Sequence, residues 1–180
     1  TVHDLSYLTR GLRGTEHATG THQTGDRFYL LSTDRVKRIE QELGLMNVGV
    51  TYKGVTFFQA VADASAIGFT NANVGQKPYA GTQASGTRSG NDLTVAWNRR
   101  DRLAGQWFQT LPKSEASEAY EVDVLNGSTV VRTLSTTSPS VSYTSAQQVT
   151  DFGSVQASVV VDIFQISETV GRGYALRETV

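Results

Sequence analysis

Residues 120–134 read YEVDVLNGSTVVRTL, and this stretch decides the fold. Apolar Tyr120, Val122 and Val124 alternate with acidic residues, which is the period-two pattern of a strand with one buried face. The Asn126-Gly127 pair that follows is the strongest short-range signal for a tight hairpin turn. The two runs on either side of this pair are therefore predicted to form antiparallel strands.

The same alternation recurs through the second half of the chain. In residues 93–97 (LTVAW) every second side chain is apolar, and Trp97 falls on the inward face, where we expect it to fill the core. The further signals are strands at 141–144, 158–167 and 174–179, and a turn that begins at Asp151-Phe152-Gly153. About ninety residues of such strands predict a fibronectin type III-like β-sandwich over 91–180.

The first half carries weaker signals, and we predict a small β-rich domain over residues 1–82. Strand candidates are 27–31 and 48–58. Residues 33–44 fit a helix or a strand, and we favour a strand at 36–39 followed by a short helical turn. The Ala-rich segment 59–67 fits either a helix or an extended chain.

Between these domains, residues 83–90 (QASGTRSG) are polar and rich in Gly, Ser and Thr. Such a composition predicts a linker. The sequence as a whole therefore predicts an all-β protein of two domains.

The composition limits the possible functions. The net charge is −1, so no overall field attracts nucleic acid, and no apolar run approaches the length of a membrane-spanning helix. The chain has no Cys, which excludes disulfides and thiolate chemistry. His17 and His22 lie five residues apart, a spacing that fits neither one helix face nor one strand face. We expect them in a solvated loop, with Glu16 and Asp26 nearby, and we predict no metal site and no cofactor.

Paired carboxylates are the residues that glycosidic catalysis requires. The candidates are Glu115, Glu118, Glu121 and Asp123. The last two lie on the outward face of a predicted strand and the first two in a polar loop, and nothing predicts the partial burial that a catalytic acid needs. We therefore predict no catalytic residues and no enzyme activity.

Two clusters are candidate contact sites. Arg99, Arg100 and Arg102 form a short basic run that suits an anionic surface or an acidic neighbouring subunit, although a solvated strand end explains it too. Trp107 and Phe108 are adjacent aromatics in a predicted loop. They fit packing within the chain, a protein interface or a sugar-stacking platform.

Several fragments of the chain resemble one family, and they occur in that family's order. The fragments are LRGTE at 12–16, GTH at 20–22, LTVAWNRR at 93–100, SEAYEVD at 117–123, VRTL at 131–134, DFG at 151–153, QIS at 165–167 and VGRG at 170–173. The chain resembles the C-terminal region of the tail-tip, or host-specificity, hub protein of gene transfer agents and long-tailed phages. Residues 40–80 resemble that family least.

The resemblance implies a structural virion protein of the tail tip that binds other tail proteins and contacts a glycan or protein of the host surface. It also implies a homo-oligomer, with a trimer suggested by related hubs. The alternative is a carbohydrate-binding accessory module of a cell-wall or polysaccharide-degrading protein, with Trp107 and Phe108 as its platform.

Overall fold

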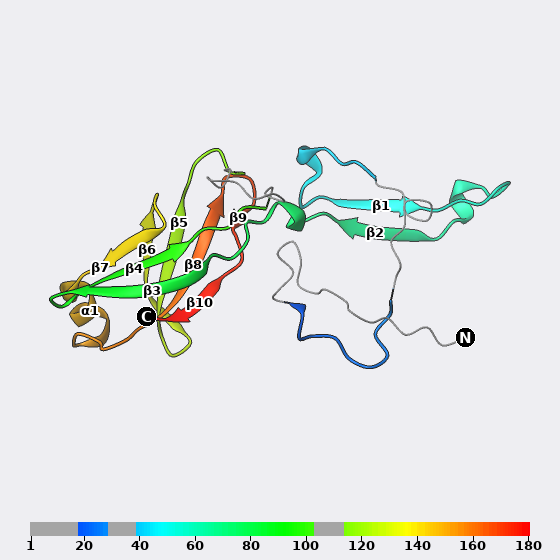
Figure 1. The fold of residues 1–180 in the computed structure, drawn as a ribbon. Helices are drawn as coiled ribbons and strands as arrows, with labels where there is room; N and C mark the ends of the chain where they lie inside the picture. The colour runs from blue at the N-terminus through cyan, green and yellow to red at the C-terminus, as the bar shows by residue number, and fades with distance from the viewer. Residues whose placement is uncertain (1–17, 29–38, 103–113) are drawn as a thin grey trace. The chain divides into compact units, whose positions relative to one another are not determined.

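The computed structural model describes residues 18–28, 39–102 and 114–180 (Figure 1). The chain divides into two compact units. One is Gln23–Gly75, and the other comprises Gln76–Val180 together with Thr1–His22. Each unit is described by itself below.

The larger unit is a sandwich of two antiparallel sheets. One sheet has the strand order β3-β4-β7, and these strands are β3 (Thr82–Ser89), β4 (Asp92–Asn98) and β7 (Ser140–Tyr143). The other sheet has the order β10-β8-β5-β6, with the short β9 beside β8. Its strands are β5 (Tyr120–Asn126), β6 (Thr129–Thr136), β8 (Val160–Ser167), β9 (Gly171–Arg172) and β10 (Leu176–Thr179). Apart from β9, the sandwich has seven strands, which in chain order are β3, β4, β5, β6, β7, β8 and β10. The first, second and fifth of these form one sheet, and the seventh, sixth, third and fourth form the other. This is the arrangement of a fibronectin type III-like sandwich, as the sequence predicts.

The core lies between the two sheets and follows the predicted alternation. Its fully covered side chains include Leu93 and Val95 of β4, Val122 of β5 and Val161 of β8. Trp97 is also buried, and its ring meets the Tyr120 ring edge to face with 5.2 Å between ring centroids. The predicted core position of Trp97 is therefore confirmed.

The predicted hairpin at Asn126-Gly127 is confirmed. Residues Asn126 and Thr129 pair directly across the turn, and Gly127 has a φ of 63°, the left-handed value that such a turn needs. A β-bulge between Val124 and Leu125 interrupts the register of the two strands.

The predicted linker at 83–90 is wrong, because residues 82–89 form strand β3. This strand pairs with β4 along most of its length, from Ser85 opposite Ala96 to Ser89 opposite Asp92. Composition misleads here because β3 is an outer strand whose polar side chains mostly face water while its backbone makes the ladder. At Gly86 an added Cβ would lie 3.0 Å from a methyl group of Leu93, so the small residue serves close packing.

The sequence patterns also missed an α-helix, α1 (Ser145–Phe152), which ends where we expected a turn to begin at Asp151-Phe152-Gly153. Thr144 and Gln147 form a capping box at its start, and Gly153 ends it with a φ of 78°. Phe152 packs against the edge of the core.

Asp151 near the end of α1 ties the helix to both sheets. Its carboxylate accepts two hydrogen bonds from Arg132 of β6, at 2.6 and 2.8 Å, and one from the Tyr143 hydroxyl of β7, at 2.7 Å. Tyr143 is fully buried, so this bond satisfies a hydroxyl that water cannot reach.

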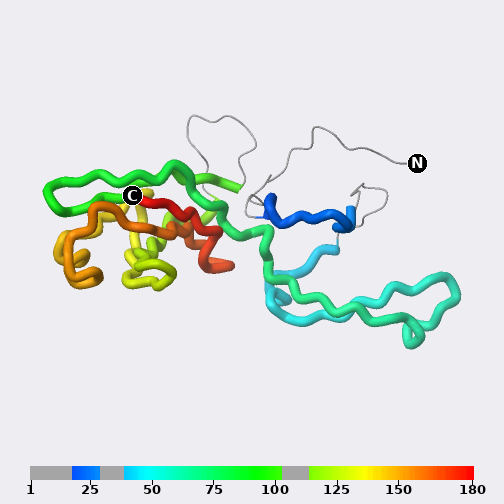
Figure 2. Tube along the Cα trace, turned by 90° about the horizontal axis from the view of Figure 1, so that it is seen from below, coloured from blue at the N-terminus to red at the C-terminus, as the bar shows by residue number. Residues whose placement is uncertain are grey.

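The smaller unit is built around one hairpin, which Figure 2 shows as a long, narrow loop of chain in cyan and teal. Its elements are the 3₁₀ turn η2 (Leu43–Leu45), β1 (Gly49–Lys53), η3 (Val61–Asp63), β2 (Ala66–Thr70) and η4 (Val74–Gln76). The strand predicted over 48–58 thus ends at Lys53, and the Ala-rich segment 59–67 is a 3₁₀ turn followed by the start of β2. The predicted strands at 27–31 and 36–39 lie largely outside the described residues.

Candidate interaction surfaces

The basic run at the end of β4 is held by aromatic and acidic side chains of the same unit. The Arg100 guanidinium lies over the Tyr79 ring, 5.3 Å from its centroid. Arg102 donates to the backbone carbonyl of Gln76 and forms an ion pair with Glu115, with 2.8 Å between Nη1 and Oε1. The Arg102 side chain therefore fastens residues that flank the sandwich, while Arg99 and Arg100 are half-buried. Trp107 and Phe108 lie outside the described residues.

The segment that precedes β3 is pinned to the sandwich by a close backbone contact. Gly173 donates a hydrogen bond to the Gln165 carbonyl at 2.8 Å, and Tyr174 donates to the Pro78 carbonyl at 3.0 Å. The Lys77 ammonium lies over the Tyr174 ring, 4.8 Å from its centroid. This contact holds the end of β8 against the chain that leads into β3.

Gly173→Ala is expected to lower the unfolding free energy by about 1–3 kcal/mol, the usual cost of overpacking. The added Cβ would lie 2.7 Å from the Pro78 carbonyl oxygen and 2.9 Å from that of Gln165, and neither backbone group moves cheaply. Urea denaturation followed by circular dichroism measures the change. Gly20→Ala is the control, because a Cβ there meets nothing within 4 Å. Equal stability of the two variants would contradict the packing described.

The outer face of the larger sheet carries a network of ion pairs. Asp123 of β5 lies directly opposite Asp162 of β8, and two adjacent carboxylates would repel each other if left alone. Each binds an arginine through both oxygens: Asp123 binds Arg172 at 2.6 and 3.0 Å, and Asp162 binds Arg177 at 2.7 and 2.5 Å.

Arg172 has two further partners on this face. It donates to the Glu121 carboxylate at 2.6 Å, and its guanidinium lies 4.5 Å from the centroid of the Phe164 ring. The carboxylates on this face are thus bound by cations, in an arrangement that stabilises the sheet surface.

The environment of Asp123 favours its charged form. Burial alone would raise its pKa, but hydrogen bonds from Arg172 and Thr133 outweigh burial, and the net pKa lies below the ordinary value. The pKa of Asp151 is likewise lowered, chiefly by the hydrogen bonds from Arg132. A general acid needs a raised pKa, so neither group has the electrostatics of that role.

Stability is expected to fall on acidification because of these two carboxylates. A group whose pKa is lowered by folding adds stability above its unfolded pKa, about 3.9 for Asp, and this contribution is lost as the pH falls through the folded value. The unfolding free energy should therefore decrease below about pH 4. In Asp151→Asn the decrease should be smaller, and urea titrations over this range measure it. An identical acid profile for both proteins would count against the stated role of Asp151.

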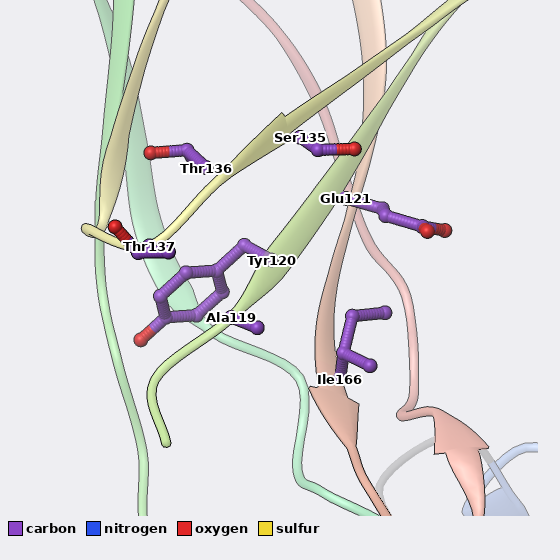
Figure 3. Close-up of a pocket in the computed structure, with 7 residues that line it drawn as sticks. All are labelled: Ala119, Tyr120, Glu121, Ser135, Thr136, Thr137 and Ile166. Atoms are coloured by element: carbon purple, nitrogen blue, oxygen red, sulfur yellow. The ribbon is translucent and has the colours of Figure 1, made fainter.

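An open pocket of about 310 Å³ lies where β5 begins and β6 and β8 end (Figure 3). It is lined by Ala119, Tyr120, Glu121, Ser135, Thr136, Thr137 and Ile166. In Figure 3 the Ser135 and Thr136 hydroxyls point in opposite directions, and Glu121 and Tyr120 project to opposite sides of β5. Because these groups diverge, the pocket does not bring reactive atoms together on one substrate.

The smaller unit has an exposed apolar surface that the sequence patterns did not predict. Among its described residues, Ala64 is the single buried hydrophobic side chain. By contrast, Phe57 and Phe58 are 92% and 100% exposed, and Ile67 and Phe69 of β2 are 65% and 52% exposed. Alternation in the sequence located β1 but gave no sign that apolar side chains paired with it, such as Ile67 and Phe69, are exposed among the described residues.

The described ranges contain no cluster of three or more His, Cys, Asp or Glu side chains that suits a metal ion. His22 and Asp26 are exposed, and His17 lies outside those ranges. In the same ranges, no helix combines the length and the apolar character needed to span a membrane.

Comparison with known proteins assigns no family. No protein-family description matches the sequence, and no protein with a curated description matches it. Solved structures do match in part. The rat CD45 extracellular region, domains d3-d4, is 15% identical with a TM-score of 0.43, and the match covers 88% of this chain and 77% of that one.

Two further structures are a bacterial enzyme and an insect domain. The spore cortex lytic enzyme SleM of Clostridium perfringens is 17% identical with a TM-score of 0.38, over 58% of this chain and 28% of that one. The FN5 domain of Drosophila Lar is 10% identical with a TM-score of 0.32, over 57% of this chain and 96% of that one. These likenesses concern the fold alone, and the fibronectin type III-like assignment stands on the strand order and core of the chain itself.

Proposed function

We propose that this protein is a non-catalytic structural component of the distal tail or tail tip of a phage or phage-like particle. There it contributes to assembly and to attachment to the host surface. Its partners are other tail proteins, further copies of itself, and a glycan or protein of the host envelope.

The observation that carries the proposal is the contrast between the two units. The sandwich buries a continuous core and binds its outer carboxylates with arginines, so it is complete as a folded body. Among its described residues, the smaller unit leaves most of its large apolar side chains in water. Large exposed apolar patches mark sites of association with other molecules. A stable sandwich joined to an apolar unit suits a protein that attaches to partners.

The placement in a phage tail tip is based on the sequence resemblance. Fragments that match the tail-tip hub family in order include residues 93–100, which hold β4, and residues 117–123, which lead into β5. The family resemblance also implies fibronectin-type modules in this region, and the fold of residues 82–179 is compatible with that expectation.

Deleting the coding sequence from a particle-producing strain tests the proposal. Particles without this protein are expected to be incomplete at one end in electron micrographs, or to fail to adsorb to host cells. Supplying the full chain from a plasmid should restore both properties. Normal particles with normal adsorption would contradict the proposal.

Two other outcomes would point elsewhere. Turnover of peptidoglycan or polysaccharide by the purified chain would make it an enzyme. Binding of a purified surface glycan that is lost in Trp107→Ala, together with normal particles after deletion, would identify a carbohydrate-binding module instead.

A further inference from the structure

We propose that the hairpin of the smaller unit, residues 47–71 and here called the arm, associates with the arm of a second copy of this chain. The two arms pack face to face and run in opposite directions about a twofold axis. This inference deepens the proposed function, on which it rests, by naming a second copy as the partner and the arm as the contact. It replaces the trimer that the resemblance suggests with a twofold pair.

The arm has one apolar face and one face of small or polar residues. Val50 pairs directly with Phe69, and Tyr52 with Ile67, so these four side chains lie together on one face. The other face carries Gly49, Thr51, Lys53, Ala66, Gly68 and Thr70. A two-stranded hairpin is at best marginally stable alone in water and needs a further layer against its apolar face.

The tip of the arm is an ordered loop that holds two aromatic rings in solvent. Gln59 accepts a hydrogen bond from the Thr56 amide at 3.1 Å, and Lys53 donates to the Val61 carbonyl at 3.0 Å. Phe57 and Phe58 contact each other edge to face with 5.2 Å between centroids. Phe58 has a φ of 65°, a strained value for an aromatic residue, and strain of this kind gathers at functional positions.

The base of the arm, at the opposite end, offers a second apolar group. Leu43 and Leu45 belong to η2, which meets the start of β1 through the hydrogen bond from the Val48 amide to the Leu45 carbonyl. Val74 follows β2 and is also exposed. In a twofold antiparallel pair, the tip of each arm covers the base of the other, and the central faces cover one another. Each apolar group thereby finds a matching group on an identical chain.

The exposed area is large enough for such an association. A fully covered aromatic ring buries about 150–250 Å², and Phe57 and Phe58 are almost wholly exposed. Seven further apolar side chains of the base, face and tip are about half exposed or more, namely Leu43, Val48, Val55, Val61, Ile67, Phe69 and Val74, whereas Leu45, Val50 and Tyr52 are more covered. Together they offer on the order of 800 Å², which is what one partner contributes to a standard interface.

Charge favours an identical chain over a charged partner. Lys53 and Asp63 are the only charged residues in the arm, so its net charge is zero. Two central faces therefore bring no net repulsion, while the base adds Glu42 beside Leu43, and an anionic lipid surface would find no basic cluster to attract it.

The association can be tested with the full-length chain by sedimentation over about a hundredfold range of concentration. The wild-type protein is expected to form a dimer. The double variant Phe57→Ser, Phe58→Ser should raise the dissociation constant of this dimer by about 100-fold. Circular dichroism should be unchanged, because these rings cover no core. Val130→Ser with Val149→Ser is the matched control, since both residues are half-exposed on the sandwich, and it should dimerise as the wild type does.

The direction of the arms is tested by cross-linking, for which the absence of native Cys is convenient. A mixture of Val61→Cys and Leu43→Cys chains should form the mixed tip-to-base disulfide faster than either chain forms a disulfide with itself. A monomer at every concentration, an unaffected serine variant, or faster tip-to-tip linking would overturn the proposal. Binding of the monomer to phosphatidylcholine vesicles, lost in the serine variant, would overturn it in favour of lipid.

The outcomes also separate this inference from the proposed function. If the purified chain is a monomer but deleting its coding sequence still abolishes adsorption, the arm-to-arm inference is contradicted and the proposed function is not. A dimer that dissociates in the serine variant, together with normal particles after deletion, would end the proposed function alone.

Discussion

Trp97→Ala is expected to remove about 3–5 kcal/mol from the unfolding free energy, which is a large part of the 5–15 kcal/mol typical of a domain. Trp97 is 4% exposed and joins the two sheets, because its ring on β4 packs edge to face against Tyr120 of β5. Its buried indole N–H has no hydrogen-bond acceptor in the described part of the chain. The loss therefore comes from packing and from the cavity left behind.

The change is measured by urea denaturation followed by far-ultraviolet circular dichroism, because the substitution removes one of the two tryptophan fluorophores. Val130→Ala on β6 is the control, since Val130 is half-exposed and should cost well under 1 kcal/mol. A Trp97→Ala protein that is as stable as this control would mean that the two sheets do not share the core described.

Asp151→Ala is expected to lower the unfolding free energy by about 2–3 kcal/mol. Removing the carboxylate leaves the buried Tyr143 hydroxyl without the acceptor for its proton and the Arg132 guanidinium without its counter-charge. Breaking a fully buried pair costs about 3–5 kcal/mol, and the smaller value applies here because Arg132 reaches solvent. The change should also loosen α1, which Asp151 connects to β6 and β7.

Tyr143→Phe is the matched control for this prediction. It removes one hydrogen bond, keeps the ring volume and leaves the ion pair of Arg132 and Asp151 in place, so it should cost about 1 kcal/mol. If Asp151→Ala cost no more than Tyr143→Phe, the ion pair would contribute nothing and the link between helix and sheets would be overstated.

The parts of the fold that sequence patterns predicted are those with strong local signals. Asn126-Gly127 fixed one hairpin, and the alternation around Trp97 and Val122 placed two core strands. Both signals are short-range: one depends on the backbone angles of a turn and the other on the period of a strand.

The errors have physical reasons. Strand β3 looked like a linker because polar, Gly-rich composition describes its side chains, whereas its place in the fold comes from backbone pairing with a distant β4 partner such as Ala96. Helix α1 has a local sequence signal, a Thr144-x-x-Gln147 capping box followed by Gly153, but Thr144 belongs to the strand predicted at 141–144 and the box was not used. The sequence marks Arg100 and Arg102 as candidate contacts with another molecule, and that role stays a prediction. Their partners within the chain, Tyr79 and Glu115, could be identified only from the fold.

The exposure of the arm's apolar face could not be predicted from the sequence for a different reason. Alternation at Val48, Val50 and Tyr52 states that one face is apolar, but it does not state whether the same chain covers that face. In the described part of the chain, Ile67 and Phe69 of that face remain exposed, and this gives the arm its proposed role.

The division of the chain into a complete sandwich and an uncovered arm is tested most directly by amide hydrogen exchange of the full-length protein at two concentrations. At the lower concentration, amides of Val122 and Val161 should be protected to nearly the full stability of the fold, and those of Val50 and Phe69 should exchange with little protection. At the higher concentration, protection should rise in the arm alone. An arm that is as strongly protected as the sandwich in dilute solution would contradict the account.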